Sequence, residues 1–395
     1  MKTIIALDSF KGCLTSTEAC QAAATGVRLA DPMADVLLVP LSDGGEGLTS
    51  VLTHAMHGQM VTVRVHGPLM EPITAQYGIA DQQTAIIEMA AACGLPLVPA
   101  GLRDPERTTT FGFGEMILDA LHRGCKQLIL GIGGSATNDA GMGMLQALGA
   151  TISFSNHEGE DTDLAHSSIA CGGNLAQIAS IDATPLSDIY NNVCILVASD
   201  VHNPLCGPTG AAHIFAPQKG ADPEAVERLD QGLHHVQQLA HVADSQPGDG
   251  AAGGLGFALR HYLHTSMRPG IELVLDQLHF DQTIADADLI ITGEGKSDAQ
   301  TLMGKVPMGV LKHAQRQGIP VHLIAGCIED AEQLSAGGFS GLRCINEDDH
   351  APLSELMKPE RAIENIQKTV QKIISDQKRR SCSLGSTDPC LGATS

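Results

Sequence analysis

Short apolar runs alternate along this chain with helical patterns and glycine-rich turns, and this alternation restricts the possible folds more than any other feature. The apolar runs have the length and composition of buried strands. They lie at residues 3–7, 36–39, 85–89, 127–131, 193–198, 288–292 and 320–325. Such a succession is typical of α/β folds, in which helices cover a mostly parallel sheet.

Helical patterns fill the stretches between several of these runs. We expect helices near residues 112–123, 139–148, 222–241, 301–317 and 359–377. Thr15 and Glu18 have the spacing of a capping box and predict a further helix up to about residue 30. In the last helix, apolar residues such as Ile366, Val370 and Ile373 form one stripe at helical spacing.

The chain has 395 residues, which is long for one domain and indicates two. Both ends look doubly wound, because residues 288–325 read as a strand, a helix and a second strand. We therefore expect a discontinuous Rossmann-like domain at 1–65 and 275–380, with an inserted α/β domain at 66–274. Residues 381–395 are polar and without periodicity, and are expected to form a disordered tail.

The charge balance narrows the possible partners. Lys and Arg number 24 and Asp and Glu number 45, so the formal net charge is −21. A field of this sign repels nucleic-acid phosphates and anionic lipid heads, so we expect neither a nucleic acid nor a membrane as partner. The 11 Cys form no Cys-x-x-Cys pair and the first apolar run is too short for a signal peptide, which favours the cytoplasm. A monomer and a homodimer both remain open.

The strongest local motif runs from Gly131 to Asp139, between an apolar run and a helical pattern. A glycine-rich turn of this kind presents free N–H groups and the positive end of a helix, which suit a phosphate or a carboxylate. Read from Gly131, the spacing also fits a dinucleotide fingerprint, which requires an acidic residue about 20 positions on. Glu158 and Glu160 lie near that distance, so an NAD(P)-dependent dehydrogenase is an alternative.

A second motif, Gly293 to Asp298, follows another apolar run and combines a flexible turn with a lysine and two carboxylates. It is not a Walker A loop, because Ile290 stands where that motif requires glycine. Downstream, Lys305 lies near the start of a helical pattern, where it is placed to contact phosphate as a point charge.

Three further turns carry carboxylates. Asp43 to Gly47 holds two carboxylates among three glycines, Asp8 to Lys11 follows the first strand, and Asp200 follows the apolar run at 193–198. Ligands of open α/β sheets bind beyond the carboxyl ends of strands. Carboxylates at those ends suit Mg²⁺, substrate hydroxyl groups or a catalytic base.

Together these motifs resemble, in their order, those of the type I glycerate kinase family, the glycerate 2-kinases. The motifs that carry the resemblance are Asp8 to Lys11, Asp43 to Gly47, Gly131 to Asp139 with Gly141, Asp200 with Asn203 to Leu205, Phe215 with Pro217 to Gly220, Ala251 to Gly254, and Thr292 to Gly295 with Asp298 and Gly304 to Pro307. The resemblance covers Lys2 to about residue 375. It implies transfer of phosphate from ATP to (R)-glycerate with Mg²⁺, giving 2-phosphoglycerate. It also implies two α/β domains with an active-site cleft between them.

The chain departs from the family pattern at a few positions. The family usually has proline where Leu7 stands, arginine where Lys296 stands, and isoleucine or leucine at Ser297. Phe111 and Phe113 replace an arginine and a small polar residue. Arginine and lysine differ at a bidentate anion site, so we expect these changes to affect how the substrate carboxylate is held.

Phosphoryl transfer needs in-line positioning and charge neutralisation, and the resembling motifs are assigned roles on that basis. Asp200 is the first choice as catalytic base and Asp298 the second, while Lys11 and Lys305 counter phosphate charge. Mg²⁺ is assigned to Asp43 and Asp200. The residues expected to bind glycerate are Asp8, Ser9, Asp43, Glu46, Glu294 and Lys296. Those expected to bind ATP are Gly131, Gly133, Gly134, Ser135, Ala136, Thr137, Asn138 and Asp139.

Three other functions stay open beside the dehydrogenase. The 2-hydroxyl and 3-hydroxyl of glycerate differ by a small shift of the substrate, so a glycerate 3-kinase and a kinase of a related hydroxy acid are alternatives. The third is a regulatory protein that has kept a sugar-acid pocket without catalysis.

Overall fold

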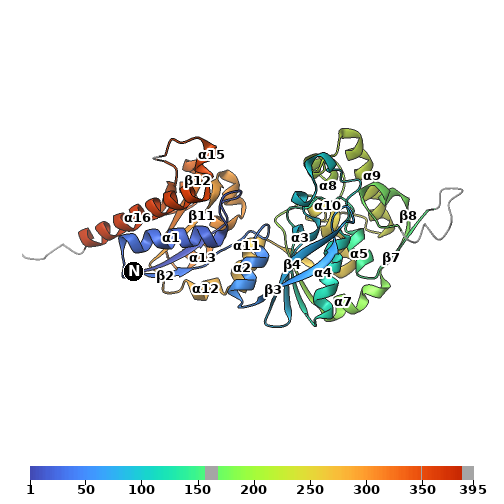
Figure 1. The fold of residues 1–395 in the computed structure, drawn as a ribbon, viewed down its shortest axis with the longest axis horizontal. Helices are drawn as coiled ribbons and strands as arrows, with labels where there is room; N and C mark the ends of the chain where they lie inside the picture. Colours follow the sequence, from blue (N-terminus) through green and yellow to red (C-terminus); the bar gives the residue numbers. More distant parts are fainter. Residues whose placement is uncertain (156–167, 348, 385–395) are drawn as a thin grey trace, which may run out of the picture. The chain divides into compact units, whose positions relative to one another are not determined.

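The computed structural model describes residues 1–155, 168–347 and 349–384 (Figure 1). The chain divides into two compact units, Met1–Leu41 with His279–Ser395, and Ser42–Leu278. We call them the discontinuous unit and the inserted unit. The first boundary falls after Leu41 rather than after residue 65, and the second after Leu278 rather than after residue 274. Both units are α/β, as expected.

The discontinuous unit is built on five parallel strands. They are β1 (Lys2–Leu7), β2 (Asp35–Leu38), β11 (Leu289–Ser297), β12 (Val321–Ile328) and β13 (Gly341–Cys344). Their order is β13-β12-β11-β1-β2. Strand order therefore reverses between β1 and β11, as in doubly wound folds, and this switch point is where such sheets bind ligands.

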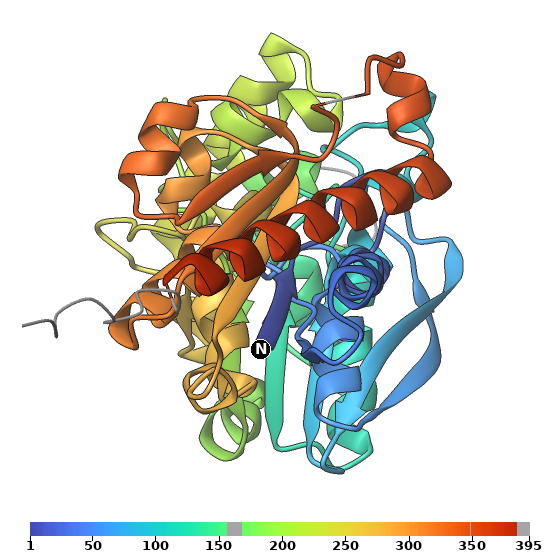
Figure 2. The same cartoon turned by 90° about the vertical axis from the view of Figure 1, so that its left-hand side faces the viewer.

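Helices cover both faces of this sheet. α1 (Ser16–Ala30) and α16 (Pro359–Leu384) pack on each other over one face, where they bury Ile5, Leu7 and Ile291 of the strands (Figures 1 and 2). The predicted capping box of Thr15 and Glu18 opens α1. The alternate strand residues are buried as well, and α13 (Val306–Arg316) contacts β1, β11 and β12. The short helices are α12 (Phe280–Thr283), α14 (Ala331–Ala336) and α15 (Leu353–Leu356).

Helix α16 continues through Leu384, so the expected disordered tail does not begin at residue 381. The remainder of that expected tail, residues 385–395, lies outside the described residues. No helix in the described ranges is long and apolar enough to cross a membrane.

The inserted unit contains a mixed sheet of six strands. They are β3 (Gln59–His66), β4 (Pro72–Ala80), β5 (Thr84–Glu88), β6 (Gln127–Gly131), β9 (Cys194–Ala198) and β10 (Ser266–Arg268). β3, β4 and β5 pair antiparallel, whereas β5, β6, β9 and β10 pair parallel. The hairpin β3–β4 ties residues 59–80 to this sheet, which is why the boundary precedes residue 65.

A smaller antiparallel pair joins β7 (Thr151–Phe154) to β8 (Ile178–Asp182). The helices of the unit are α2 (Leu48–Ala55), α3 (Ala90–Cys93), α4 (Phe111–His122), α5 (Met142–Ala147), α7 (Ser187–Asn192), α8 (Ala211–Phe215), α9 (Pro223–Leu239), α10 (Ala251–Leu263) and α11 (Gly270–Gln277).

The four parallel strands of the inserted unit end in register. Glu88 of β5 pairs with Gly131 of β6, which pairs with Ala198 of β9, which in turn pairs with Arg268 of β10. The four turns that leave these strands therefore start from one row across the sheet. Groups far apart in the sequence meet at this edge.

Candidate functional site

The turn Asp43 to Gly47 lies over this edge of the inserted unit. Gly44 has φ +89°, and a Cβ there would stand 2.8 Å from the Ala198 Cβ and 3.0 Å from the Gly270 Cα. Only glycine tolerates both the left-handed backbone and this close approach. The Oδ1 of Asp43 accepts a hydrogen bond from the Gly45 N–H, at 3.1 Å. The turn is thus fixed against the ends of β9 and β10.

Asp200 stands two residues beyond β9 on the same edge. Its Oδ1 accepts a hydrogen bond of 3.1 Å from the N–H of Gly270, the first residue of α11. The side chain is exposed, but surrounding protein atoms remove part of its hydration, and the Asp43 carboxylate adds repulsion. Together they raise the pKa of Asp200 to about 6. The structure therefore brings the two predicted metal ligands, Asp43 and Asp200, into electrostatic contact.

Glu88, at the end of β5, is a neighbouring carboxylate that sequence reasoning missed. It accepts hydrogen bonds from the Thr49 N–H at 2.6 Å and from the Gly47 N–H at 3.3 Å, and so binds the start of α2. Burial raises its pKa, and the nearby Glu46 adds to the rise. The signal was available, because Glu88 lies near the end of the predicted strand 85–89 just as Asp200 follows another predicted strand.

A pocket of about 440 Å³ opens beside these carboxylates within the inserted unit. Its lining combines apolar side chains, glycines and polar or charged side chains. The lining residues are Leu95, Pro96, Arg103, Ile132, Gly133, Gly134, Ser135, Val201, Phe215, Gln218, Lys219 and Ala252. Val201 directly follows Asp200, so the pocket adjoins the acidic pair. The motif Ala251 to Gly254 contributes Ala252 to the lining.

Lys219 is the one lysine among these lining residues. Its side chain is almost fully buried, and Nζ donates to the Ser135 Oγ at 2.8 Å and to the Thr137 carbonyl at 2.7 Å. Gly220 follows with φ +107°, and a Cβ there would lie 2.2 Å from the Arg103 carbonyl oxygen. Gly220, the residue after Lys219, therefore packs closely against the backbone of Arg103.

The motif Gly131 to Asp139 meets the pocket only in part. Gly133, Gly134 and Ser135 line it. Gly131 is buried at the end of β6, and Ala136 to Asp139 are buried, with Ala136 donating its N–H to the Cys93 carbonyl. Gly131, Ala136, Thr137, Asn138 and Asp139 do not line this pocket, and their expected contact with ATP stays a prediction. Helix α5 begins only at Met142 rather than at residue 139, so its N-terminus is not at the turn either.

Asp139 instead links separate segments in the interior of the inserted unit by hydrogen bonds. Its carboxylate accepts five hydrogen bonds at 2.7–3.3 Å, from the Thr109 Oγ1, the Thr110 N–H and Oγ1, and the N–H groups of Gly141 and Gly143. Burial is the main cause that raises the pKa of Asp139, and these bonds oppose the rise. The residue joins the segment before α4 to the start of α5.

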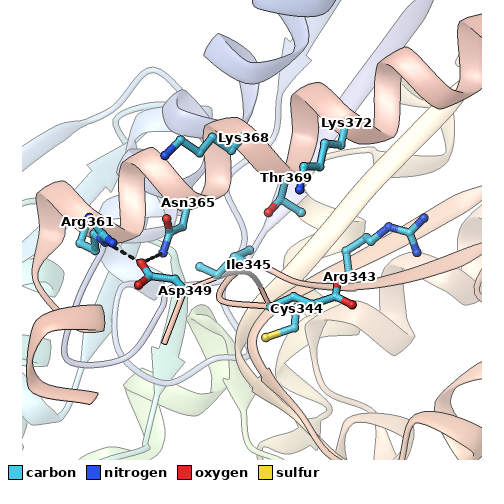
Figure 3. A pocket seen from close by; sticks show the side chains of 10 residues that line it. Arg343, Cys344, Ile345, Asp349, Arg361, Asn365, Lys368, Thr369 and Lys372 are labelled. Carbon is cyan, nitrogen blue, oxygen red and sulfur yellow. Dashed lines mark hydrogen bonds and ion pairs between the residues drawn. The ribbon is translucent and has the colours of Figure 1, made fainter. Parts of the chain in front are cut away.

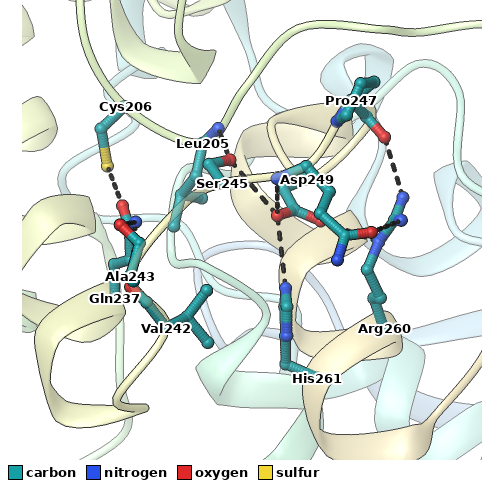
Figure 4. A network of polar contacts seen from close by, with 11 residues as sticks. Leu205, Cys206, Gln237, Val242, Ala243, Ser245, Pro247, Asp249, Arg260 and His261 are labelled. Atoms are coloured by element: carbon teal, nitrogen blue, oxygen red, sulfur yellow. Dashed lines mark hydrogen bonds and ion pairs between the residues drawn. The ribbon is translucent and has the colours of Figure 1, made fainter.

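A second buried carboxylate, Asp249, supports the loop that follows Asp200 (Figure 4). It accepts from the Gln246 N–H at 2.7 Å and the Ser245 Oγ at 3.2 Å, and pairs with Arg260 at 2.9 Å. Ser245 Oγ in turn accepts from the Leu205 N–H at 2.7 Å. The network therefore anchors the loop that carries Val201 in the pocket wall.

In the discontinuous unit, the predicted residues gather at the switch point between β1 and β11. Asp8 is buried, and its Oδ1 accepts a hydrogen bond of 2.6 Å from the Ser9 N–H. A Cβ on Gly295 of β11 would lie 3.3 Å from the backbone N of Lys11, so the turn after β1 runs beside β11. The Lys11 side chain is exposed.

Glu294 is the buried centre of this group. Its Oε1 accepts from the Thr301 Oγ1 at 2.6 Å and the Ser297 Oγ at 3.0 Å, and its Oε2 lies 4.0 Å from the Nζ of Lys305. Burial is the main cause that raises the pKa of Glu294, while Thr301 and Lys305 lower it. Lys305 is the N-cap residue of α13, as its motif indicated.

The segment Gly293 to Ser297 is strand, not the flexible loop expected from its glycines. It pairs with β12 up to Ile328, so ladder bonds occupy its backbone groups. Lys296 projects from it, exposed, 3.0 Å from Glu329 and 4.0 Å from Asp298. Asp298 caps the short 3₁₀ turn that precedes α13, through its bond with the Gln300 N–H at 2.9 Å.

Another hollow of the discontinuous unit, of about 170 Å³, lies between α16 and the loop after β13 (Figure 3). There Asp349 accepts from the Arg361 Nε at 2.5 Å and from the Asn365 Nδ2 at 3.0 Å. Arg361 and then Asn365 lower the pKa of Asp349. None of the predicted site residues lines this hollow, and its bonds hold the loop onto α16.

A model of the glycerate kinase family matches residues 3–378. The chain belongs to the glycerate kinase family. It is 46% identical over 354 residues to a glycerate kinase of Bacillus subtilis, across 87% of this chain and 90% of that protein. It is 44% identical over 336 residues to the glycerate 2-kinase of Escherichia coli, across 84% and 86% of the two chains.

The solved crystal structure of a candidate glycerate kinase 2 from Salmonella typhimurium is also similar. The TM-score is 0.83 at 41% identity, and the match covers 97% of this chain and 99% of that one. The expected resemblance to glycerate kinases and the expected α/β fold are thereby confirmed, as is the expectation that the chain is a kinase of this family. The acidic residues of the dehydrogenase alternative, Glu158 and Glu160, lie outside the described residues.

Two departures from the pattern of the glycerate kinase family do not line the pocket. Phe113 is fully buried in the core on α4. The Phe111 ring lies edge-on to His66, with ring centroids 5.9 Å apart. The expected effect of these two residues on how a substrate carboxylate is held stays a prediction.

Proposed function

We propose that this member of the glycerate kinase family transfers the terminal phosphoryl group of ATP to (R)-glycerate, producing 2-phospho-(R)-glycerate and ADP in the cytoplasm. The observation that carries the proposal is the pocket of the inserted unit, which is lined by apolar residues, a buried lysine and Val201, the neighbour of Asp200 in the acidic pair. These three parts match a nucleobase, its phosphates and a metal ion. The glycerate kinase and glycerate 2-kinase names of the relatives supply the acceptor.

The pocket has the composition that an adenine nucleotide requires. Leu95, Pro96 and Phe215 offer apolar surface for the base. Gly133 and Gly134 are exposed and bring the backbone close to the space where phosphates would lie. Arg103 and Lys219 provide positive charge in a chain whose net charge is strongly negative.

Asp43 and Asp200 fit a magnesium ion. Both carry carboxylate oxygens, the ligands that Mg²⁺ prefers, and repulsion from Asp43 adds to the loss of hydration that raises the pKa of Asp200. A divalent cation would remove that repulsion. When bound, Mg²⁺ neutralises charge on the transferring phosphoryl group. Asp200 remains the first choice as base and Asp298 the second, because Asp298 uses its carboxylate to cap the turn before α13.

The group around Glu294 is proposed to bind the acceptor. Asp8 and Glu294 offer carboxylate oxygens for the hydroxyl groups of glycerate, and Lys11, Lys296 and Lys305 offer cations for its carboxylate and for phosphate. Ser9, Asp43 and Glu46 stay in this proposal as further substrate contacts. Family membership removes the nicotinamide-dependent dehydrogenase as an alternative.

Lys305→Ala is expected to lower kcat by roughly 10²–10³-fold, because it removes a cation held at the start of a helix beside Glu294. The measurement is steady-state ADP release with Mg²⁺-ATP and glycerate. Lys312→Ala, an exposed lysine on the same helix, is the matched control and should leave kcat unchanged. A rise in KM alone for Lys305→Ala would contradict a role in the transition state.

The product distinguishes the proposal from its nearest alternative. The chain is incubated with ATP, Mg²⁺ and (R)-glycerate, and enolase is then added without phosphoglycerate mutase. Phosphoenolpyruvate formed by enolase alone identifies 2-phosphoglycerate. Signal that needs the mutase identifies a glycerate 3-kinase, and the absence of ADP would overturn the proposed reaction.

A further inference from the structure

The buried ammonium group of Lys219 has no counter-charge beside it among the described residues of the inserted unit. The side chain is 2% exposed, yet its two hydrogen-bond partners, the Ser135 hydroxyl and the Thr137 carbonyl, are both neutral. Among the described residues, no carboxylate lies within ion-pair distance of Nζ. A buried ammonium without a counter-charge is costly, so the neutral amine gains population.

The charged groups near Lys219 influence the balance between its charged ammonium form and its neutral amine form. Asp139 attracts the ammonium from a distance, but its oxygens already accept five hydrogen bonds from Thr109, Thr110, Gly141 and Gly143. Arg103 lines the same pocket and adds positive charge. Burial therefore dominates and lowers the pKa of Lys219 to about 7, against the attraction of Asp139.

We propose that Lys219 binds the phosphates of ATP and takes up a proton from solvent when it does so. The inference rests on the proposed function, since it needs ATP in the pocket that Lys219 and Ser135 line. The nucleotide phosphates are the counter-charge that the protein itself does not supply. Nζ gains one proton from the buffer, and no covalent bond to the nucleotide forms.

The direction in which ATP affinity changes with pH follows from the protonation of Lys219 in the free and the ATP-bound protein. In the free protein Lys219 is charged below its pKa of about 7 and neutral above it. An adjacent polyanion favours the charged form, so binding raises this pKa. ATP affinity should therefore be highest below pH 7 and should weaken above it, approaching roughly tenfold for each pH unit.

Calorimetric titration of the full chain with ATP and Mg²⁺, without glycerate, measures the proton directly. At pH 8 the phosphates of ATP and the Asp200 carboxylate are already ionised, so neither contributes. The dependence of the observed enthalpy on the ionisation enthalpy of the buffer should give uptake of about 0.9 proton. Lys219→Arg is always charged and should bind ATP with no such uptake.

Lys219→Met should weaken ATP binding by roughly 10–100-fold, because a charge-assisted bond is lost. Lys126→Met, at an exposed lysine of the same unit, is the matched control and should bind as the wild type does. Equal proton uptake by the wild type and Lys219→Arg would overturn the inference while leaving the kinase proposal intact. A wild-type chain that does not bind ATP would instead overturn the proposed function.

Discussion

Asp200→Asn is expected to lower kcat by roughly 10²–10⁴-fold, the loss that accompanies removal of a general base. The substitution keeps the size of the side chain and an oxygen that can accept from the Gly270 N–H, so the fold should persist. It removes the negative charge next to Asp43 that the proposed base and metal roles both need. The readout is ADP formation at saturating ATP, Mg²⁺ and glycerate.

The pH profile tests the same residue in the wild type. A base must be ionised, and the pKa of Asp200 is raised to about 6, so kcat/KM should fall as the pH drops through 6. The matched control is Asp188→Asn, an exposed aspartate on α7, which should leave both kcat and the profile unchanged. Near wild-type turnover of Asp200→Asn, with ATP and glycerate still bound, would exclude Asp200 as base and as metal ligand.

Asp139→Ala should cost about 3–5 kcal/mol of unfolding free energy in the inserted unit. The change leaves five buried hydrogen-bond donors of Thr109, Thr110, Gly141 and Gly143 without their acceptor. Those donors join the segment before α4 to α5, so their loss loosens the core on that side of the sheet.

Tyrosine fluorescence during urea unfolding measures this effect selectively. The chain has no Trp, and its three Tyr, at 77, 190 and 262, all lie within the inserted unit. Asp188→Ala, at an exposed site of the same unit, should shift the transition little. A midpoint for Asp139→Ala close to that of the control would show that Asp139 does not hold the unit together.

The sequence predicted strands well because parallel strands buried on both faces need continuous apolar runs. Residues 127–131 and 85–89 were therefore located to within one residue of β6 and β5. The hairpin β3–β4 was not foreseen, since its strands alternate exposed and buried residues and lack a continuous run. That omission displaced the expected domain boundary to residue 65.

Glycines led to a wrong prediction of a loop in one segment and to a correct prediction of a turn in another. Between 293 and 297 they suggested a loop, but Gly293 sits where a Cβ would lie 2.1 Å from the Ile324 carbonyl oxygen, so the glycine serves strand packing. At Gly44 the same residue type does mark a turn, the one that carries the proposed metal ligand Asp43. Sequence alone does not distinguish these uses, because the clash partner comes from a strand far along the chain.

Some polar residues that are close together in the sequence face different parts of the structure. Ser135 faces the pocket whereas Asp139, four residues on, faces the core. The backbone turns again directly after Asp139, at Ala140, whose φ is +52°. Lys219 was recognised only as part of a motif, because its burial against Ser135 depends on contacts 84 residues apart.

The position of β1 between β2 and β11 has a consequence for the order of folding. β1 pairs with β2 after a connection that contains only α1, whereas its other neighbour, β11, starts at Leu289, which pairs with Thr3. During synthesis the first strand therefore waits, with one edge unpaired, until the whole of Ser42–Leu278 has left the ribosome. The contiguous inserted unit is then the natural first intermediate. By drawing its own two ends into one folded body, it shortens the long loop that β1 and β11 must close.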